Sequence, residues 1–151
     1  MGAHAAAQQT FSRYAHALNR GTADEVGDCF TEDAVLHVGA RTVEGRSAIR
    51  DFYGGYVIDD LRSRCDHMRH RTSSVHAVEQ GGVVTAVCYF DVDGVVVEAQ
   101  DNFWGNVVAA DSIVSNAGRY EAEIIPAEEQ FRMLSVFTEW ASVRPRVQGE
   151  S

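Results

Sequence analysis

Histidines at alternate positions mark one segment of the chain as a candidate for proton-transfer chemistry. The sequence favours a strand over 67–78, and strand alternation places His70, Thr72, Ser74 and His76 on one face, with the neighbouring arginines on the other. Histidine titrates close to neutral pH and therefore suits the role of a proton shuttle. This polar row either lines a wet, reactive cavity or faces solvent, and His70 is the stronger candidate because His76 lies near a strand end.

Two further polar side chains lie on predicted apolar faces. Tyr14 belongs to the apolar stripe of a helix predicted over 8–20, where it is either a core residue or a hydroxyl that faces a cavity. Asp101 shares a strand face with Ala99 and Phe103, unless that face is the solvent side of the sheet. A carboxyl group on an apolar face must find a partner or stay neutral.

The spacing of the histidines disfavours a metal site. His67 and His70 point to opposite faces of a strand, and His70 and His76 stand about 20 Å apart at roughly 3.3 Å per residue. A metal would need further ligands from other strands, such as His37 or Asp101. We therefore expect a site without metal or cofactor.

The composition excludes several other kinds of chemistry. All 13 basic residues are arginines, so Schiff-base chemistry, an internal pyridoxal-phosphate site and a P-loop lysine are ruled out. No nucleophile elbow and no dinucleotide-binding glycine motif occurs. The 22 acidic residues give a net charge of −9, which disfavours binding to nucleic acid or to anionic membranes.

Cysteine usage and the absence of a secretory signal indicate a cytoplasmic protein. Cys29, Cys65 and Cys88 are odd in number and widely spaced, which is typical of reduced structural thiols. No apolar stretch approaches the roughly 20 residues that span a bilayer. A length of 151 residues predicts a single domain with a core of its own.

The first half of the chain predicts three helices and a short hairpin, identified by apolar spacing and by capping residues. The expected elements are a helix over 8–20 ended by Gly21, a helix capped by Thr22 with Glu25 three residues on, strands at 34–38 and 41–44, and a helix from Ser47 to about Tyr56.

The second half predicts strands and one last helix. The expected strands are 67–78, 83–91, 95–105 and 112–124, with hairpin turns at Gly81–Gly82 and Asp93–Gly94 and a helix over 126–142 opened by Pro126. Residues 1–7 and 143–151 are expected to be flexible ends. The fold class is α+β, with a cone-shaped, curved, mostly antiparallel sheet, N-terminal helices on its concave face and an extra C-terminal helix.

Three stretches in this order resemble the nuclear-transport-factor-two-like superfamily, and within it the SnoaL-like and ketosteroid isomerase-like proteins. RYAHALNRGTADEVGDCFTEDAV is similar to the two opening helices and first strand, VEGRSAIRDFY to the third helix, and AQDNFW to an Asp-x-aromatic motif on the penultimate strand. The resemblance covers a SnoaL-like domain over residues 8–125. It implies the cone fold more specifically than any one function, because isomerases, dehydratases, cyclases, epoxide hydrolases and inert binding modules share this fold.

The resemblance also implies roles for individual residues. Tyr14 matches the oxyanion-hole tyrosine of ketosteroid isomerases, and Asp101 matches their protonated aspartic acid. Their general base would fall at Val38, which carries no carboxylate, and the adjacent His37 shares that face only if the register shifts. His70 matches a cavity histidine of SnoaL-like proteins, which favours dehydration, cyclisation or another proton-transfer rearrangement.

Two function hypotheses follow from these residues. The first is a cofactor-independent isomerase or lyase that acts on a hydrophobic ring-containing or polyketide-like molecule, with Tyr14, Asp101, His70 and His37 as catalytic candidates. Its substrate-binding candidates are Phe52, Tyr56, Phe103 and Trp104. The second is a non-catalytic ligand-binding module, similar to small subunits of ring-hydroxylating oxygenases. A third possibility is an epoxide hydrolase-like enzyme, in which a carboxylate such as Asp101 and an arginine would activate water. The resemblance further implies a homodimer.

Overall fold

Two helices open the chain, a short hairpin and a second helical segment follow, and strands make up the rest. The computed structural model describes residues 2–103 and 106–145, with the backbone alone for 101–103 and 106. The helical elements are α1 (Ala3–Arg20), α2 (Ala23–Gly27), α3 (Arg46–Tyr53), the π-helix η1 (Gly54–Leu61) and α4 (Arg62–Arg64). The strands are β1 (Phe30–Val38), β2 (Arg41–Glu44), β3 (Cys65–Gln80), β4 (Val83–Val96), β5 (Gln100–Phe103), β6 (Asn106–Val108), β7 (Ser112–Ile125) and β8 (Gln130–Pro145).

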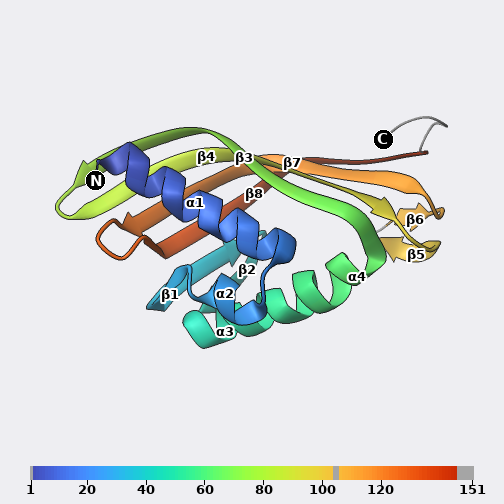
Figure 1. Cartoon of the computed structure of the whole chain (residues 1–151), viewed down its shortest axis with the longest axis horizontal. Helices are drawn as coiled ribbons and strands as arrows, with labels where there is room; N and C mark the ends of the chain where they lie inside the picture. The colour runs from blue at the N-terminus through green and yellow to red at the C-terminus, as the bar shows by residue number, and fades with distance from the viewer. Residues whose placement is uncertain (1, 104–105, 146–151) are drawn as a thin grey trace.

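Six of these strands form one curved sheet in the order β2-β1-β8-β7-β4-β3. All pairings in it are antiparallel except that of β1 with β8, which is parallel. Helix α1 crosses one face of the sheet, and α3, η1 and α4 follow its edge below α1 (Figure 1). The α+β class and the mostly antiparallel sheet under N-terminal helices are thus confirmed.

The core lies between α1, the α3–η1 segment and the inner face of the sheet, and aromatic rings fill its centre. Tyr14 packs edge-on against Phe30, Tyr120 and Phe131, with ring centroids 5.5–6.0 Å apart. Phe11 stacks on Tyr120 at 5.9 Å. These rings are buried and each removes a large apolar area from water, so they anchor α1 to the sheet.

The predicted helix starts are confirmed in part. The Thr22 hydroxyl accepts a hydrogen bond from the Glu25 backbone N–H at 3.2 Å, which caps α2 as expected. The flexible N-terminus expected over 1–7 is wrong for residues 3–7, because α1 begins at Ala3. Ala6 and Ala7 are fully buried there, so the apolar stripe of α1 extends further back than predicted.

The predicted C-terminal helix over 126–142 is wrong, because this segment forms strand β8. Phe131 and Met133 of β8 pair with neighbouring residues of β7, so the residue between them is an extra one on β8. The register shifts a second time between Ala117 and Gly118 of β7. Each such bulge adds a residue, so apolar side chains on one face are separated by three positions instead of two. That spacing imitates a helix, although β8 is an interior strand held between β1 and β7.

The turn predicted at Asp93–Gly94 is wrong, and the strand predicted over 95–105 is interrupted at 97–99, between β4 and β5. Strand β4 continues to Val96, and Asp93 pairs with Arg69 on one side and Ser115 on the other. A Cβ atom at Gly94 would lie 3.0 Å from the Cys65 Cβ, so glycine here allows a close approach to β3 rather than a turn. Gly81 and Gly82 do form the expected hairpin turn, with φ of 62° and 80°.

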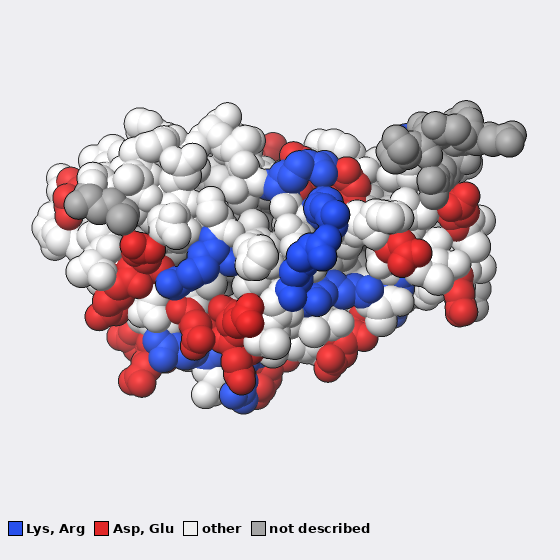
Figure 2. All heavy atoms as spheres, in the orientation of Figure 1, with Lys and Arg blue, Asp and Glu red and all other residues white. Residues whose placement is uncertain are grey.

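Charge is unevenly distributed on the surface. Figure 2 shows arginines gathered in one band on a face of the molecule, with acidic side chains spread around it. Arg20, Arg62 and Arg69 line a shallow groove at the end of α1 and the start of β3. Within the described part of the chain, no helix combines the length and apolar character needed to cross a membrane.

Candidate active site

A cavity of about 100 Å³ lies between α1, the α3–η1 segment and the inner face of the sheet. Aromatic and aliphatic side chains line most of it, and besides the tyrosines the described polar residues that reach it are His70, Asn116 and Thr138. Tyr56 and Thr138 are exposed and mark where the cavity opens to solvent. An apolar cavity of about 150 Å³ can hold benzene, so a single ring fits here only if it also occupies the mouth.

Three tyrosine hydroxyls meet at the inner end of the cavity. The Tyr14 and Tyr53 hydroxyls are 2.6 Å apart, and Tyr120 interacts with Tyr14 from strand β7. Burial raises the pKa of all three phenols, so each keeps its proton. When one hydroxyl donates to its neighbour, the neighbour still has a hydrogen to donate. The cluster can therefore offer a hydrogen bond to a ligand oxygen.

His70 is held against the C-terminal end of α1 by the side chain of Asn19. The Asn19 Oδ1 accepts a hydrogen bond from the His70 backbone N–H at 2.6 Å, and the Asn19 Nδ2 donates to the His70 carbonyl oxygen at 3.1 Å. The same Oδ1 lies 3.3 Å from the His70 Nδ1. Because an amide oxygen can only accept, this contact favours the tautomer with the proton on Nδ1 and a lone pair on Nε2.

Burial lowers the pKa of His70 from 6.5 to about 4. The cause is burial, which removes solvation from the charged imidazolium. His70 is therefore neutral at pH 7 and lines the cavity as a base rather than as a cation.

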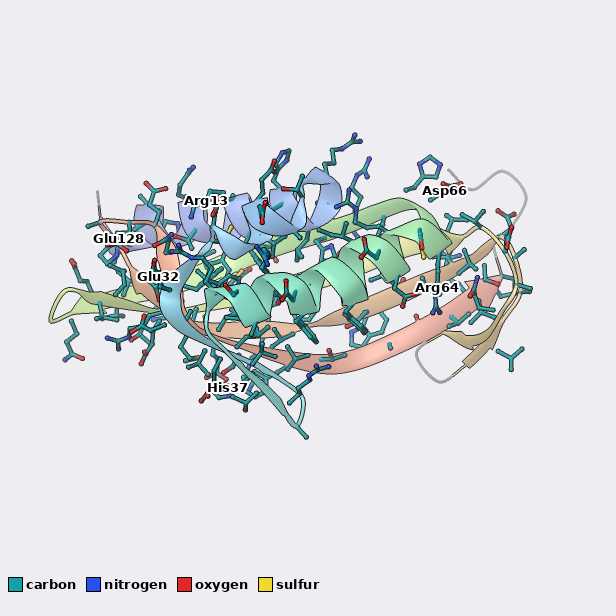
Figure 3. The ribbon with its side chains drawn as sticks, turned by 90° about the horizontal axis from the view of Figure 1, so that it is seen from below. Arg13, Glu32, His37, Arg64, Asp66 and Glu128 are labelled. Carbon is teal, nitrogen blue, oxygen red and sulfur yellow. The ribbon has the colours of Figure 1, made fainter. Side chains whose placement is uncertain are left out.

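The other predicted histidine lies away from the cavity. His37 follows Leu36, which is buried, and precedes Val38, which lines the cavity, so alternation turns His37 to the other face. Its Nδ1 lies 3.1 Å from the Thr42 Oγ1 across the β1–β2 hairpin. Figure 3 shows it on that hairpin, so the structure does not bring this predicted catalytic residue to the cavity.

The polar row predicted on β3 is interrupted by a bulge. His70 and Thr72 face inward, but the register shifts between Ser73 and His76, and Ser74 has a φ of 56°. The bulge turns Val75 inward and leaves His76 exposed.

The predicted ligand-contact residues divide into two groups. Phe52 and Tyr56 line the cavity, with their rings stacked at 5.6 Å. The side chains of Asp101 and Phe103, and the whole of Trp104, lie outside the described residues. The backbone of β5, which carries Asp101, pairs with β6 in a separate two-stranded sheet and not with the six-stranded one.

Sequence reasoning missed Asn19, Asn116 and Tyr120 as cavity or site residues. Tyr120 and Asn116 are separated by four positions on β7, so both face inward. Strand alternation in the sequence could have placed them on the same face. Asn19 carries no comparable signal, because its role depends on how the end of α1 packs against β3. In the described part of the chain no group of three or more histidine, cysteine or acidic side chains could hold a metal ion.

The sequence matches the SnoaL-like domain over residues 2–136. The chain belongs to the SnoaL-like family. This match covers the four helices α1–α4, most of the sheet and every cavity residue except Thr138. A search against curated protein sequences finds no match.

Solved structures share the SnoaL-like fold at low sequence identity. A type 2 hexachlorocyclohexane dehydrochlorinase (LinA) is 14% identical with a TM-score of 0.73, over 97% of this chain and 92% of that one. A candidate scytalone dehydratase from Novosphingobium aromaticivorans is 13% identical with a TM-score of 0.71, over 97% and 93%. A protein of unknown function from Mycobacterium tuberculosis is 20% identical with a TM-score of 0.64, over 89% and 70%.

Proposed function

We propose that this SnoaL-like protein is a cofactor-independent enzyme that moves a proton on a small, mostly apolar ring compound. The observation that carries the proposal is the placement of His70, which is neutral, fixed by Asn19 and directed into the cavity. The dehydrochlorinase and dehydratase among the structural neighbours are named for eliminations, and every such elimination includes the transfer of a proton to a base. That likeness supports a lyase or isomerase.

The proposed reaction uses two parts of the cavity. The His70 Nε2 accepts a proton from a ring carbon, and the C–H electron pair becomes an enolate or a new double bond. In an isomerisation the imidazolium returns the proton to another carbon; in a dehydration the departing hydroxide takes it and leaves as water. The tyrosine cluster around Tyr14 donates a hydrogen bond to an oxygen that gains negative charge, a contribution worth several kcal/mol in comparable sites.

The size of the cavity limits the substrate class. A volume of about 100 Å³ accommodates part of one ring, with the remainder at the mouth near Tyr56, rather than several fused rings. Within the range of ring-containing and polyketide-like molecules expected from the sequence, we therefore favour single-ring compounds.

Proton abstraction can be tested without knowing the natural substrate. A panel of single-ring ketones is incubated with the protein in D2O, and loss of the C–H signal next to the carbonyl is followed by proton NMR. His70→Gln should slow exchange by about 10²–10⁴-fold, the usual contribution of a general base. His37→Gln is the matched control, because it removes a histidine outside the cavity and should leave exchange unchanged.

A ligand-binding module without catalysis is the second candidate function. Val38 favours it, because this residue lines the cavity at the position where a ketosteroid isomerase-like enzyme would be expected to carry its base. Compounds that bind in the cavity but show no exchange in either wild type or His70→Gln would support this second function and contradict the first.

A further inference from the structure

An asparagine on the inner face of the sheet stands opposite His70. The register pairs His70 with Val92, and Val92 with Asn116, across strands β3, β4 and β7. Neighbouring strands lie about 4.8 Å apart, so the Cα atoms of His70 and Asn116 are separated by about 10 Å. All three side chains line the same cavity, with the apolar Val92 between two polar ends.

The Asn116 Oδ1 is buried and has no hydrogen-bond partner among the described residues. Burying an amide oxygen without a partner is unfavourable, so native proteins usually satisfy such an atom. The tyrosine hydroxyls bond to one another at the inner end of the cavity, and none of them is a hydrogen-bond partner of this oxygen. A ligand in the cavity can supply the missing donor.

We propose that Asn116 is a specificity residue that accepts a hydrogen bond from a hydroxyl or N–H group of the ligand. The substrate class is then a single-ring compound that carries a hydrogen-bond donor on the side opposite the carbon facing His70. The position of the reacting carbon rests on the proposed function, whereas the donor requirement rests only on the cavity and the unpartnered amide.

An amide that rotates by 180° exchanges its oxygen and nitrogen, and the rotated form would demand an acceptor from the ligand. Three probe molecules of similar shape distinguish these cases. Phenol offers a donor and an acceptor, anisole offers only an acceptor, and toluene offers neither. Their affinities for the folded protein are measured by titration of the ¹⁵N-labelled chain followed by NMR.

The variant Asn116→Leu removes the amide at nearly constant volume. The quantity compared between wild type and variant is the ratio of the affinity for phenol to the affinity for toluene. Phenol and toluene differ in hydrophobicity, but this difference cancels when their affinity ratio is compared between wild type and variant. The ratio should shift about tenfold toward toluene in Asn116→Leu, a factor that corresponds to 1.4 kcal/mol. Ser115→Ala, on the opposite face of β7, is the control and should leave the ratio unchanged.

Three outcomes overturn the proposal: a ratio that changes by less than twofold, a wild-type preference for anisole over phenol, or no binding of any probe. If Asn116→Leu does not fold, Asn116→Ala gives the same comparison without adding volume. His70→Gln should keep the wild-type preference for phenol. If the wild type prefers phenol but catalyses no proton exchange, the Asn116 site stands and the proposed enzymatic function is wrong. The two proposals can therefore fail separately.

Discussion

Acidification should destabilise the wild-type protein more than the His70→Gln variant. Burial lowers the pKa of His70 to about 4 in the folded protein, whereas an unfolded chain restores the ordinary value of 6.5. Above pH 6.5 the imidazole is neutral in both states and makes no contribution. Between pH 6.5 and 4 the unfolded chain binds a proton that the folded protein excludes, so the free energy of unfolding falls.

The size of this effect follows from the two pKa values. One pKa unit corresponds to 1.36 kcal/mol, so the fall from 6.5 to about 4 corresponds to about 3 kcal/mol. Most of it, about 2–3 kcal/mol, should be lost by pH 4.5, and below pH 4 the loss should level off because both states are protonated. Glutamine does not titrate, so His70→Gln should lack this component.

Urea unfolding at pH 7 and pH 4.5 measures the effect as a difference between variants. Titration of the carboxylates and of the other histidines is common to both proteins and cancels. His37→Gln should follow the wild type, because His37 lies outside the cavity. Equal losses of stability in wild type and His70→Gln, within about 0.5 kcal/mol, would refute the burial of a neutral His70.

Two further predictions concern the partners of the site. Tyr14→Phe leaves the Tyr53 hydroxyl buried without its 2.6 Å partner, so urea unfolding should show a loss of about 1–3 kcal/mol; stability equal to that of the wild type would mean that water replaces the lost hydroxyl. Asn19→Asp places a carboxylate beside His70 and should raise the pKa of the imidazole from about 4 toward 6.5, seen as an upward move of its NMR titration; an unmoved titration would show that residue 19 does not contact the ring.

The sequence predicts the helices and the sheet well where local patterns and tertiary structure agree. Thr22 and Gly81–Gly82 mark a helix start and a turn by chemistry that acts within a few residues. The pattern of strand β8 imitates a helix because one of its bulges separates Phe131 and Leu134 by three positions. Its strand identity comes from β1 and β7 on either side, which no local pattern reveals.

The site residues also divide into those that local patterns predict and those that only the tertiary structure reveals. Tyr14 and His70 lie on regular stretches of α1 and β3, so periodicity and the family resemblance place them correctly at the cavity. His37 fails by one residue of strand register, which turns a side chain to the opposite face. Asn19 and Asn116 become visible only when the end of α1 and the inner face of β7 are in place.

At neutral pH, His70 should present an unprotonated Nε2 to the cavity. The ¹⁵N chemical shifts of the His70 ring measure this directly in selectively labelled protein. Between pH 5 and 8 they should show a neutral imidazole with the proton on Nδ1, and the Nε2 signal should move when a cavity ligand such as phenol is added. An imidazolium at pH 7, or a proton on Nε2 with Nδ1 free, would contradict the account.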